Sequence, residues 1–379
     1  MAKKLFIEAG SIAEKNMSGV GHTALSIVRE LAQNTVFTSN FTITLLVPFN
    51  KTELVKAHDL PDTVKIRKIY IPGKIMNGLV RFNLVPYMDI LFGTGTYLFP
   101  NFKNWPLLRS KSITYIHDVY FKIAPEHIES KNLDLLEKHT GRFIGRADTI
   151  ITVSNHAKSE IETYFPESMG KIEVVHNGVD HNLYYPRSTD EQELVARKYD
   201  VVVGSYFVFF SNIEPRKNVD TLLDAYKLFV DEKKQKEIAL LLIGGMGWAN
   251  EGIITKMKEL EAAGYKVIKP PMYVPDEDIP ALLTGAISLI HPAVYEGFGL
   301  TPLEAMACGS QVVVGDNSSL PEVMGADYND YVDVTNPETL KSAMIHCYDN
   351  PKFNQYGVER ARVFSWKISA ERLAEIIRS

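Results

Sequence analysis

The sequence alternates short β-rich runs with stretches that have the apolar spacing of helices, and this alternation occurs twice. The strand-like runs recur over residues 4–179 and again over residues 206–316. Such alternation is typical of α/β folds, in which crossover helices connect parallel strands. A chain of 379 residues is long enough for two domains of ordinary size. We therefore predict two doubly wound, Rossmann-like domains, joined near residues 180–200, that face each other across a cleft at the carboxyl ends of their sheets.

Two local expectations follow from the same reading. The run MDILFG, residues 88–93, is predicted to be a strand of the first sheet. The polar stretch PRSTDEQELVARKYD, residues 186–200, is predicted to connect the two domains.

Charge, cysteine content and hydropathy limit the possible partners. The formal charge of -5 argues against a general nucleic-acid binder. Residues 1–180 hold 21 Lys and Arg against 18 Asp and Glu, a charge of +3, which leaves 20 against 28, or -8, for the rest. An ordinary solvated surface explains the basic half better than an anionic acceptor or a membrane surface. The two cysteines, Cys308 and Cys347, provide no disulfide framework, so a reducing cytoplasm is expected. The sequence has no apolar run long enough to span a membrane, so any membrane contact is expected to be peripheral.

Two adjacent cations, Arg216 and Lys217, follow the apolar run YFVFF in the segment EPRKN. A planar guanidinium and a compact ammonium, next to the N-terminus of a helix that begins near Asn218, suit a diphosphate. A solvated loop that ends in a capping asparagine explains the same residues about equally well.

The segment YEGFGLTPLEAMACG places two glutamates, Glu296 and Glu304, around a pair of glycines. Gly297 and Gly299 let backbone N–H groups approach a ligand, and the following helix directs its positive end toward the same point. Glu304 also fits a structural explanation, a capping box with Thr301 as N-cap. Glu296 fits no such box. Carboxylates accept hydrogen bonds from sugar hydroxyls. The combination of diphosphate-binding cations, a glycine turn and two glutamates therefore indicates that the ligand is a nucleotide sugar.

These residues also resemble a known family. Glu296–Gly309 is similar to the E-x7-E segment of retaining family 4 glycosyltransferases of the GT-B fold, and FSNIEPRKN resembles their donor-diphosphate loop. Further similar segments extend over nearly the whole chain: SGVGHTALSIVREL, YIHDVYF, ITVSNHAKSEI, VVHNGVD, YVPDEDIPALLTGA and SSLPEV. The resemblance implies an acceptor-binding domain at residues 1–185, a nucleotide-sugar-binding domain at residues 200–360, and a C-terminal helix at 361–379 that crosses back to the first domain.

The resemblance also implies roles for the donor-side residues. Arg216 and Lys217 would bind the donor diphosphate, Glu304 the ribose hydroxyls, and Glu296 the hydroxyls of the transferred sugar. The remaining implied donor-side residues are Gly297, Phe298, Gly299 and Leu300 at the phosphate and sugar, and Met272, Tyr273 and Val274 near the base.

In the first domain the resemblance implies that His117 faces the reacting sugar. A buried histidine bonded to Asp118 is the other explanation for this residue. Gly19 and Gly21 would form a loop that approaches the donor phosphate and the acceptor, although Val20 stands where many relatives have a glycine.

The implied activity is retaining transfer of a sugar from a nucleoside-diphosphate donor to a hydroxyl of a glycan or lipid-linked glycan, with GDP-mannose ranked first. The acceptor is expected on the first domain, where residues 82–108 supply many aromatic side chains. No Asp-x-Asp stands in a metal-site context, and Asp276–Asp278 is expected to cap a helix. We therefore expect metal-independent transfer without any cofactor besides the donor substrate.

Three other functions compete with this one. A nucleotide-sugar epimerase or hydrolase on the same fold would act without an acceptor, and a sugar-binding protein would not catalyse at all. A dinucleotide-dependent oxidoreductase is disfavoured because no convincing G-x-G-x-x-G follows the first strand. The combined presence of Arg216, Lys217, Glu296 and Glu304 favours the glycosyltransferase.

Overall fold

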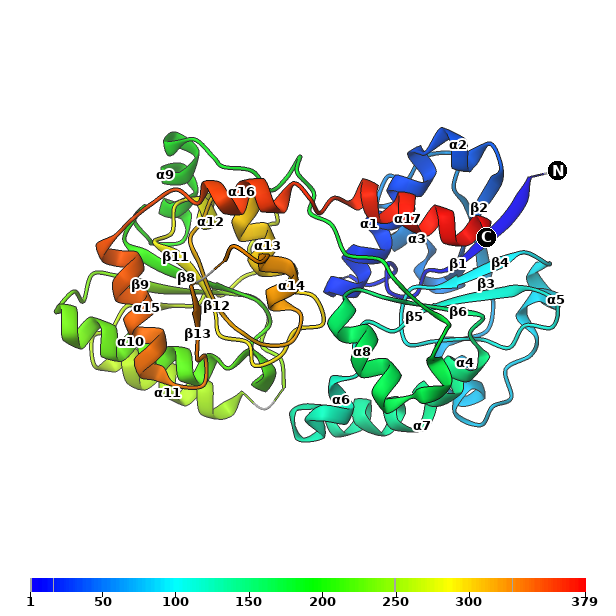
Figure 1. Ribbon diagram of the computed structural model, residues 1–379, viewed down its shortest axis with the longest axis horizontal. Coiled ribbons are helices and arrows are strands. Elements are labelled where there is room, and N and C mark those ends of the chain that lie inside the picture. The colour runs from blue at the N-terminus through cyan, green and yellow to red at the C-terminus, as the bar shows by residue number, and fades with distance from the viewer. Residues whose placement is uncertain (1, 16, 249, 329) are drawn as a thin grey trace. The chain divides into compact units, whose positions relative to one another are not determined.

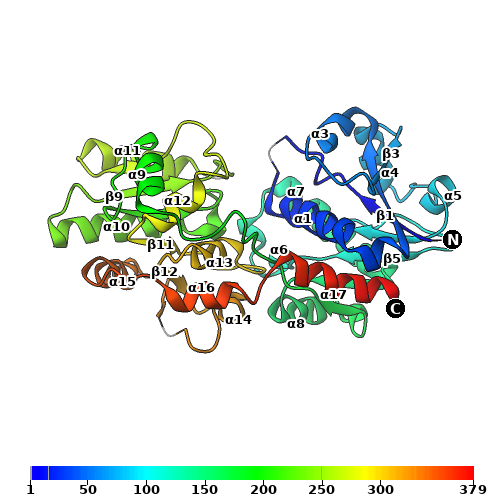
Figure 2. The ribbon, with the colours of Figure 1, turned by 90° about the horizontal axis from the view of Figure 1, so that it is seen from above.

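The computed structural model describes residues 2–15, 17–248, 250–328 and 330–379. The chain forms two compact units, shown in Figures 1 and 2: unit 1 is Met1–Gly178 with Trp366–Ser379, and unit 2 is Val179–Ser365. Each unit is built on a parallel sheet with helical connections, so the α/β prediction is confirmed.

Within the described residues, the sheet of unit 1 has seven strands in the order β3-β2-β1-β4-β5-β6-β7. The strands are β1 (Lys3–Glu8), β2 (Phe41–Pro48), β3 (Lys65–Ile69), β4 (Thr96–Phe99), β5 (Lys111–Tyr115), β6 (Thr149–Thr152) and β7 (Ile172–Val174). The helices are α1 (Gly19–Gln33), α2 (Thr35–Thr38), α3 (Thr52–Lys56), α4 (Gly73–Arg81), α5 (Met88–Phe92), α6 (Tyr120–Ile123), α7 (Ser130–Arg146), α8 (Asn155–Tyr164) and α17 (Trp366–Arg378). The strand order reverses between β1 and β4, which is where ligands bind in such sheets.

The sheet of unit 2 has six strands among the described residues, in the order β10-β9-β8-β11-β12-β13. The strands are β8 (Tyr206–Phe210), β9 (Ala239–Ile243), β10 (Val267–Ile268), β11 (Ser288–His291), β12 (Val312–Gly315) and β13 (Tyr331–Val332). The helices are α9 (Thr189–Lys198), α10 (Val219–Lys233), α11 (Glu251–Ala262), α12 (Ile279–Thr284), α13 (Leu300–Ala307), α14 (Leu320–Met324), α15 (Pro337–Asp349) and α16 (Gln355–Ala361). Here the order reverses between β8 and β11.

Buried β-branched, aromatic and leucine side chains explain why the central strands form. Every residue of β9 is buried, and so are the first four residues of β8. A strand that is apolar on both faces requires helices on both sides of the sheet. Helix α10 supplies part of that cover, with Leu222, Tyr226 and Phe229 in the core beside Phe207.

The prediction of a strand at residues 88–93 was wrong, because this run forms the short helix α5. The buried carboxylate of Asp89 accepts hydrogen bonds from the backbone N–H groups of Leu108, at 2.9 Å, and Arg109, at 2.7 Å. The strand in this part of the sheet is β4, which follows Gly93 and Gly95 and pairs with β1 through Phe6 and Tyr97.

The stretch expected to connect the domains contains helix α9 and belongs to unit 2. Its N-terminus has a capping box, in which Ser188 and Glu191 bond to each other's backbone N–H groups. Arg197 and Glu193 pair across one turn, and Val195 and Ala196 are buried. Local capping and charge pairing thus make this polar segment helical.

The chain passes between the units at two neighbouring segments, with Val179 pairing with Ser365 in a parallel bridge. After the second passage, α17 packs beside α1 in unit 1, as both views show. Ser369 donates a 2.6 Å hydrogen bond to the carbonyl of His176, and Arg372 pairs with Glu173 at 2.8 Å. None of the helices in the described ranges is long and apolar enough to cross a membrane.

Candidate active site

The segments EPRKN and YEGFG meet at the switch point of the unit 2 sheet. EPRKN follows β8, YEGFG follows β11, and these two strands are hydrogen-bonded neighbours, with Phe207 opposite Ser288. The backbone N–H of Val294 donates to the carbonyl of Arg216 at 3.0 Å, which joins the two loops directly. The sheet therefore brings the two most specific sequence motifs into contact.

Glu296 is the centre of a buried ionic cluster. Its Oε1 accepts hydrogen bonds from Lys217 Nζ and from His291 Nε2, the latter at 2.7 Å, and its Oε2 pairs with Arg216 at 3.5 Å. Glu296 and Lys217 are both buried. Arg216 also pairs with Glu214 at 3.0 Å. Arg216 and Lys217, the residues predicted to bind the diphosphate, thus both contact carboxylates. A diphosphate that enters the site would compete with these carboxylates for the N–H groups of the two cations.

The charges of this cluster stabilise one another. Burial alone would raise the pKa of Glu296, but Lys217, His291 and Arg216 outweigh it and hold the pKa well below its usual range. Burial lowers the pKa of Lys217, which the charge of Glu296 opposes. Burial likewise lowers the pKa of His291, so its imidazole is neutral near pH 7 with the proton on Nε2. Glu296 is therefore an ionised hydrogen-bond acceptor.

Three residues that support Glu296 were not identified from the sequence. His291 is the last residue of β11 and orients the carboxylate. Ser318 Oγ accepts from the backbone N–H of Glu296 at 2.9 Å, and Ser319 Oγ contacts the carbonyls of Glu296 and Phe298, both at 2.8 Å. His291 could have been predicted as a site residue, because it is a polar residue at the carboxyl end of an apolar strand, where doubly wound sheets bind ligands. The serines lie in SSLPEV, a segment that carried no residue assignment.

The glycine turn fixes where helix α13 begins. Gly299 is its N-cap with φ of 104°, a left-handed conformation, and Leu300 is its first residue. Thr301 therefore lies inside the helix, and Glu304 is in the second turn, too far along for a capping box. The capping-box explanation of Glu304 was wrong, because the glycine conformation starts the helix earlier than threonine would.

Replacing Gly299 with alanine should lower both stability and activity. A Cβ at this position would lie 2.9 Å from Leu320 Cδ2, and the positive φ disfavours alanine. We expect a loss of about 1–3 kcal/mol in the free energy of unfolding, measured by urea denaturation. Gly252→Ala, in α11, is the control: apart from neighbouring residues of the helix itself, no described atom lies within 4 Å of the new Cβ, so the substitution should stabilise by about 0.5–1 kcal/mol. Equal effects of the two substitutions would contradict this account.

Glu304 lies in a second cluster with the segment expected to bind the base. Tyr184 acts to lower the pKa of Glu304, whereas the negative charge of Asp276 acts to raise it. The Tyr273 hydroxyl bonds Asp276, Val274 is buried, and Met272 is exposed. Burial, with a smaller contribution from Asp276, raises the pKa of Glu304 to about 8. A protonated carboxyl here can both donate to and accept from ribose hydroxyls.

This raised pKa predicts a pH-dependent stability. The native carboxyl keeps its proton to about pH 8, whereas in the unfolded chain it ionises near 4.5. Between these values the native state binds more protons, so rising pH destabilises it, by at most about 1.4 kcal/mol per pH unit and less for this partly exposed side chain. Melting temperatures from pH 5 to 9 should show Glu304→Gln gaining on the wild type up to about pH 8. Glu371→Gln, exposed on α17, is the control, and a pH-independent difference for Glu304→Gln would refute the prediction.

Two residues expected to cap helices direct their side chains elsewhere. Asn218 precedes α10 with φ of 53°, and its amide donates to the carbonyl of Val334 at 2.7 Å. Asp278 precedes α12, and its carboxylate bonds Lys198 at 2.8 Å and the Tyr199 hydroxyl at 2.7 Å. Asp278 thus holds the predicted N-cap position of α12, but its carboxylate ties α12 to α9 and makes no capping hydrogen bond.

The three site residues predicted in the first domain all lie in unit 1. His117 follows β5, and its Nε2 bonds the carbonyl of Pro100 at 2.9 Å. Asp118 instead accepts from the backbone N–H of Tyr120, so the explanation of His117 as a partner of Asp118 was wrong. Burial lowers the pKa of His117, which Pro100 and Asp118 oppose.

Gly19 and Gly21 lie in the first turn of α1, not in a loop as expected. A Cβ on Gly21 would come within 2.7 Å of the carbonyl oxygen of Ser11, so glycine is needed there for close backbone packing. The structure thus gives Gly21 a packing role in addition to the predicted binding role.

No metal site is evident in the parts of the chain that the structure describes: no three His, Cys, Asp or Glu side chains gather closely enough to hold an ion. The predicted metal independence therefore needs a test in solution.

Comparisons with known proteins identify the family of this chain. Residues 201–364 match the family described as Glycosyl transferases group 1, and residues 17–183 match Glycosyltransferase Family 4. O-antigen chain mannosyltransferase B of Escherichia coli is 33% identical over 273 residues, which are 71% of this chain and 70% of that protein. Alpha-maltose-1-phosphate synthase of Mycolicibacterium smegmatis is 28% identical over 249 residues, 61% of this chain and 63% of that protein.

Two solved structures share the fold. Anabaena HepE in complex with UDP and glucose matches over the whole of both chains with a TM-score of 0.70 and 18% identity. Sucrose-phosphate synthase from Thermosynechococcus elongatus matches with a TM-score of 0.72 and 16% identity, covering 100% of this chain and 98% of that one. The chain therefore belongs to the group 1, family 4 glycosyltransferases and has their GT-B fold.

Proposed function

We propose that this glycosyltransferase moves a hexose, with mannose ranked first, from a nucleoside-diphosphate donor to a hydroxyl group of a glycan, with retention of anomeric configuration and without a metal ion. The observation that carries the proposal is the buried cluster of Glu296 with Lys217, Arg216 and His291 at the switch point of unit 2. It combines cations for a diphosphate with an ionised carboxylate for sugar hydroxyls.

In the proposed reaction the bond between the anomeric carbon and the diphosphate oxygen breaks, and a bond from that carbon to the acceptor oxygen forms. The acceptor's hydroxyl proton moves to the departing diphosphate. Arg216, Lys217 and the N-terminus of α13 stabilise the charge that develops on the leaving group. We prefer a route in which the acceptor attacks the anomeric carbon from the same face of the sugar that the leaving group leaves. A double displacement would need a carboxylate nucleophile, and neither the sequence motifs nor the described site assigns one.

The ranking of mannose rests on the relatives. The Escherichia coli relative is named as a mannosyltransferase, and so is a Mycolicibacterium hassiacum relative, MMP alpha-(1->4)-mannosyltransferase, 28% identical over 235 residues. The HepE structures hold UDP, so uridine donors must be tested beside guanosine donors.

A transfer assay tests this proposal. Purified enzyme is incubated with GDP-mannose, UDP-glucose or UDP-N-acetylglucosamine and an α-linked mannose disaccharide, with and without EDTA, and the product is analysed by NMR. We expect an α-linked trisaccharide from GDP-mannose with EDTA present. A β-linked product would refute retention, loss of activity in EDTA would refute metal independence, and transfer only from a uridine donor would refute the mannose ranking.

A further inference from the structure

The glycine turn of the candidate active site, Gly297–Gly299, contains one side chain, that of Phe298. Glycines on both sides give the backbone of this turn more conformational freedom than other residues would. Yet Gly299 adopts a φ of 104°, and the start of α13 depends on it. Contacts of Phe298 are therefore a means by which the rest of unit 2 can hold the turn in one shape.

The Phe298 ring packs on a ring near the end of unit 2. Phe298 and Phe364 are both buried, their ring centroids are 5.7 Å apart, and their planes meet at 77°. Aromatic pairs prefer this edge-to-face geometry, at centroid separations of about 4.5–7 Å. Phe364 follows α16, which packs against α13 (Figures 1 and 2). The side chain of the turn is thus anchored on Phe364, while its backbone N–H is the group expected to meet the donor.

Phe364 is itself held in place by its neighbours. Its carbonyl accepts hydrogen bonds from the N–H of Val179 at 3.2 Å and from His181 Nε2 at 3.1 Å. The guanidinium carbon of Arg360 lies 4.9 Å from the centre of the ring, which is a cation–π contact. Backbone and ring are both restrained, so Phe364 can support Phe298.

Arg360 supports the turn by a second route, through α14. Its guanidinium donates hydrogen bonds to the carbonyls of Val323 at 2.9 Å and Glu322 at 2.6 Å, near the end of that helix, where a cation is favourable. Ser319 directly precedes α14, and its hydroxyl donates to the carbonyl of Phe298 at 2.8 Å. Arg360 therefore holds the helix that begins next to the hydrogen-bond partner of the turn.

We propose that Phe364 and Arg360 are positioning residues of sugar transfer. They hold Phe298 so that the N–H groups of residues 298–300 and the N-terminus of α13 face the donor diphosphate before it binds. The proposal rests on the proposed transferase function, because it concerns the donor and its departing diphosphate. A turn that is ordered in advance stabilises the developing charge without reorganising during the reaction. Without this support the turn is misplaced, and a displacement of about 1 Å can slow an enzyme about 10²-fold.

Steady-state kinetics with GDP-mannose and an α-linked mannose disaccharide test the proposal. We expect Phe364→Leu to lower kcat by about tenfold to 10²-fold. The KM for the donor should change less than kcat, because Arg216 and Lys217 remain to bind the nucleotide. Arg360→Met should lower kcat in the same way but by less, since the contact between the two rings stays.

Phe229→Leu is the matched control. Phe229 packs edge-to-face on Phe207 in the core of unit 2, with ring centroids 5.0 Å apart and planes at 88°. The substitution removes the same kind of contact away from the glycine turn, so it should lower stability and leave kcat unchanged. A loss of kcat in Phe229→Leu equal to that in Phe364→Leu would overturn the proposal.

A double variant tests whether the two phenylalanines act through one contact. The kcat of Phe298→Leu combined with Phe364→Leu should equal that of the less active single variant. Effects of the two substitutions that multiply would show that Phe364 does not act through Phe298.

Hydrogen exchange of residues 296–309 in the ligand-free enzyme tests the support of the turn without any donor. Local openings govern the exchange of such a segment, whereas core strands exchange through larger unfolding. Phe364→Leu should speed the exchange of residues 296–309 about tenfold, as for the loss of one aromatic pair, and Phe229→Leu should instead speed that of β8 and β9.

Unchanged exchange of residues 296–309 in Phe364→Leu would overturn the proposal. Should Phe364→Leu fail to fold, Arg360→Met provides the same comparisons of kcat and of exchange. Wild-type enzyme that transfers no sugar would count against the transferase function, whereas hydrogen exchange judges the support of the turn alone.

Discussion

Replacing Lys217 with alanine is expected to reduce sugar transfer by about 10²- to 10³-fold, because in the proposed reaction Lys217 supplies a fixed charge to the departing diphosphate. It should also destabilise unit 2. The substitution leaves the buried carboxylate of Glu296 without its closest cation, and breaking a buried ion pair costs about 3–5 kcal/mol. His291 and Arg216 still contact Glu296, so the lower end of this range is expected. Steady-state kinetics and urea denaturation measure the two effects.

A double substitution separates the two roles of Lys217. Lys217→Ala combined with Glu296→Gln removes both buried charges and should recover much of the lost stability, while transfer stays low. Lys227→Ala, on the exposed face of α10 where Lys227 pairs with Asp231, is the control and should change stability by less than about 0.5 kcal/mol. A double variant no more stable than Lys217→Ala would show that the two charges are not coupled.

Replacing Glu296 with glutamine is expected to reduce transfer by about 10²-fold or more while GDP still binds. The substitution removes the ionised carboxylate that we propose as the acceptor for sugar hydroxyls, but it keeps the shape of the side chain. It also releases Lys217 and Arg216 from their carboxylate partner, so GDP should bind as well as before or more tightly. Isothermal titration with GDP and with GDP-mannose distinguishes the nucleotide contacts from the sugar contacts.

Glu214→Gln provides the matched comparison, because among the described residues the Glu214 carboxylate also pairs with Arg216 but forms no ion pair with Lys217. This variant should lose much less activity than Glu296→Gln. Weaker GDP binding in Glu296→Gln would indicate that the carboxylate organises the diphosphate site instead of binding the sugar.

Much of the fold was predictable because, along most of the chain, the spacing of apolar residues in the sequence matches the residues that the structure buries. The run FTITLLVP forms β2, and YFVFFS contains β8, since apolar β-branched and aromatic residues are typical of strands between two helical layers. MDILF has the composition of a strand, yet it forms α5, in which the buried carboxylate of Asp89 binds backbone groups of residues 108 and 109. That contact joins segments far apart in the sequence, so local pattern could not reveal it.

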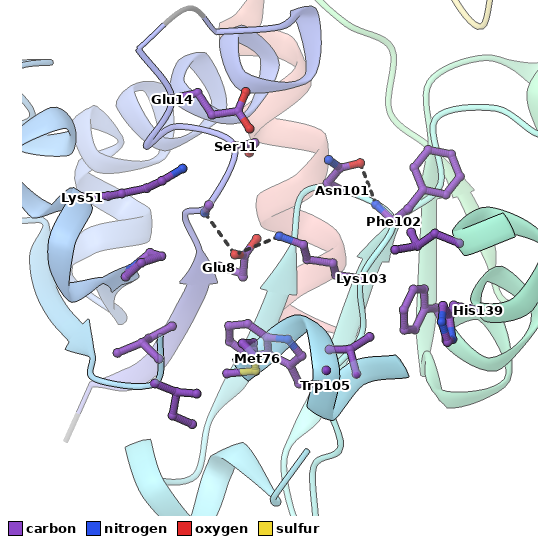
Figure 3. A pocket seen from close by; sticks show the side chains of 18 of the residues that line it. Glu8, Ser11, Glu14, Lys51, Met76, Asn101, Phe102, Lys103, Trp105 and His139 are labelled. Carbon is purple, nitrogen blue, oxygen red and sulfur yellow. Dashed lines mark hydrogen bonds and ion pairs between the residues drawn. The ribbon is translucent and has the colours of Figure 1, made fainter. Parts of the chain in front are cut away.

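The site was predictable to the level of motifs but not of contacts. Strand order places EPRKN beside YEGFG, as the sequence indicated. The sequence did not show that Glu296 pairs with Lys217 and Arg216, because the pairing depends on how two loops close over the sheet edge. The role of His291 depends on the same closure. Likewise, a pocket of unit 1 that contains Glu8 (Figure 3) is lined by residues after several strand ends and by residues of α4 and α7, which no single motif represents.

The most direct test of the central claim is a thermal-shift screen with GDP, UDP, GDP-mannose, UDP-glucose and UDP-N-acetylglucosamine, with and without EDTA, on the wild type and on Lys217→Ala. A nucleotide at about 100 times its dissociation constant should stabilise the protein by about 2.7 kcal/mol. We predict selective stabilisation by the guanosine ligands that persists in EDTA and disappears in Lys217→Ala. Folded wild-type protein that no nucleotide stabilises would contradict the assignment of Arg216, Lys217 and Glu296 as a nucleotide-sugar site.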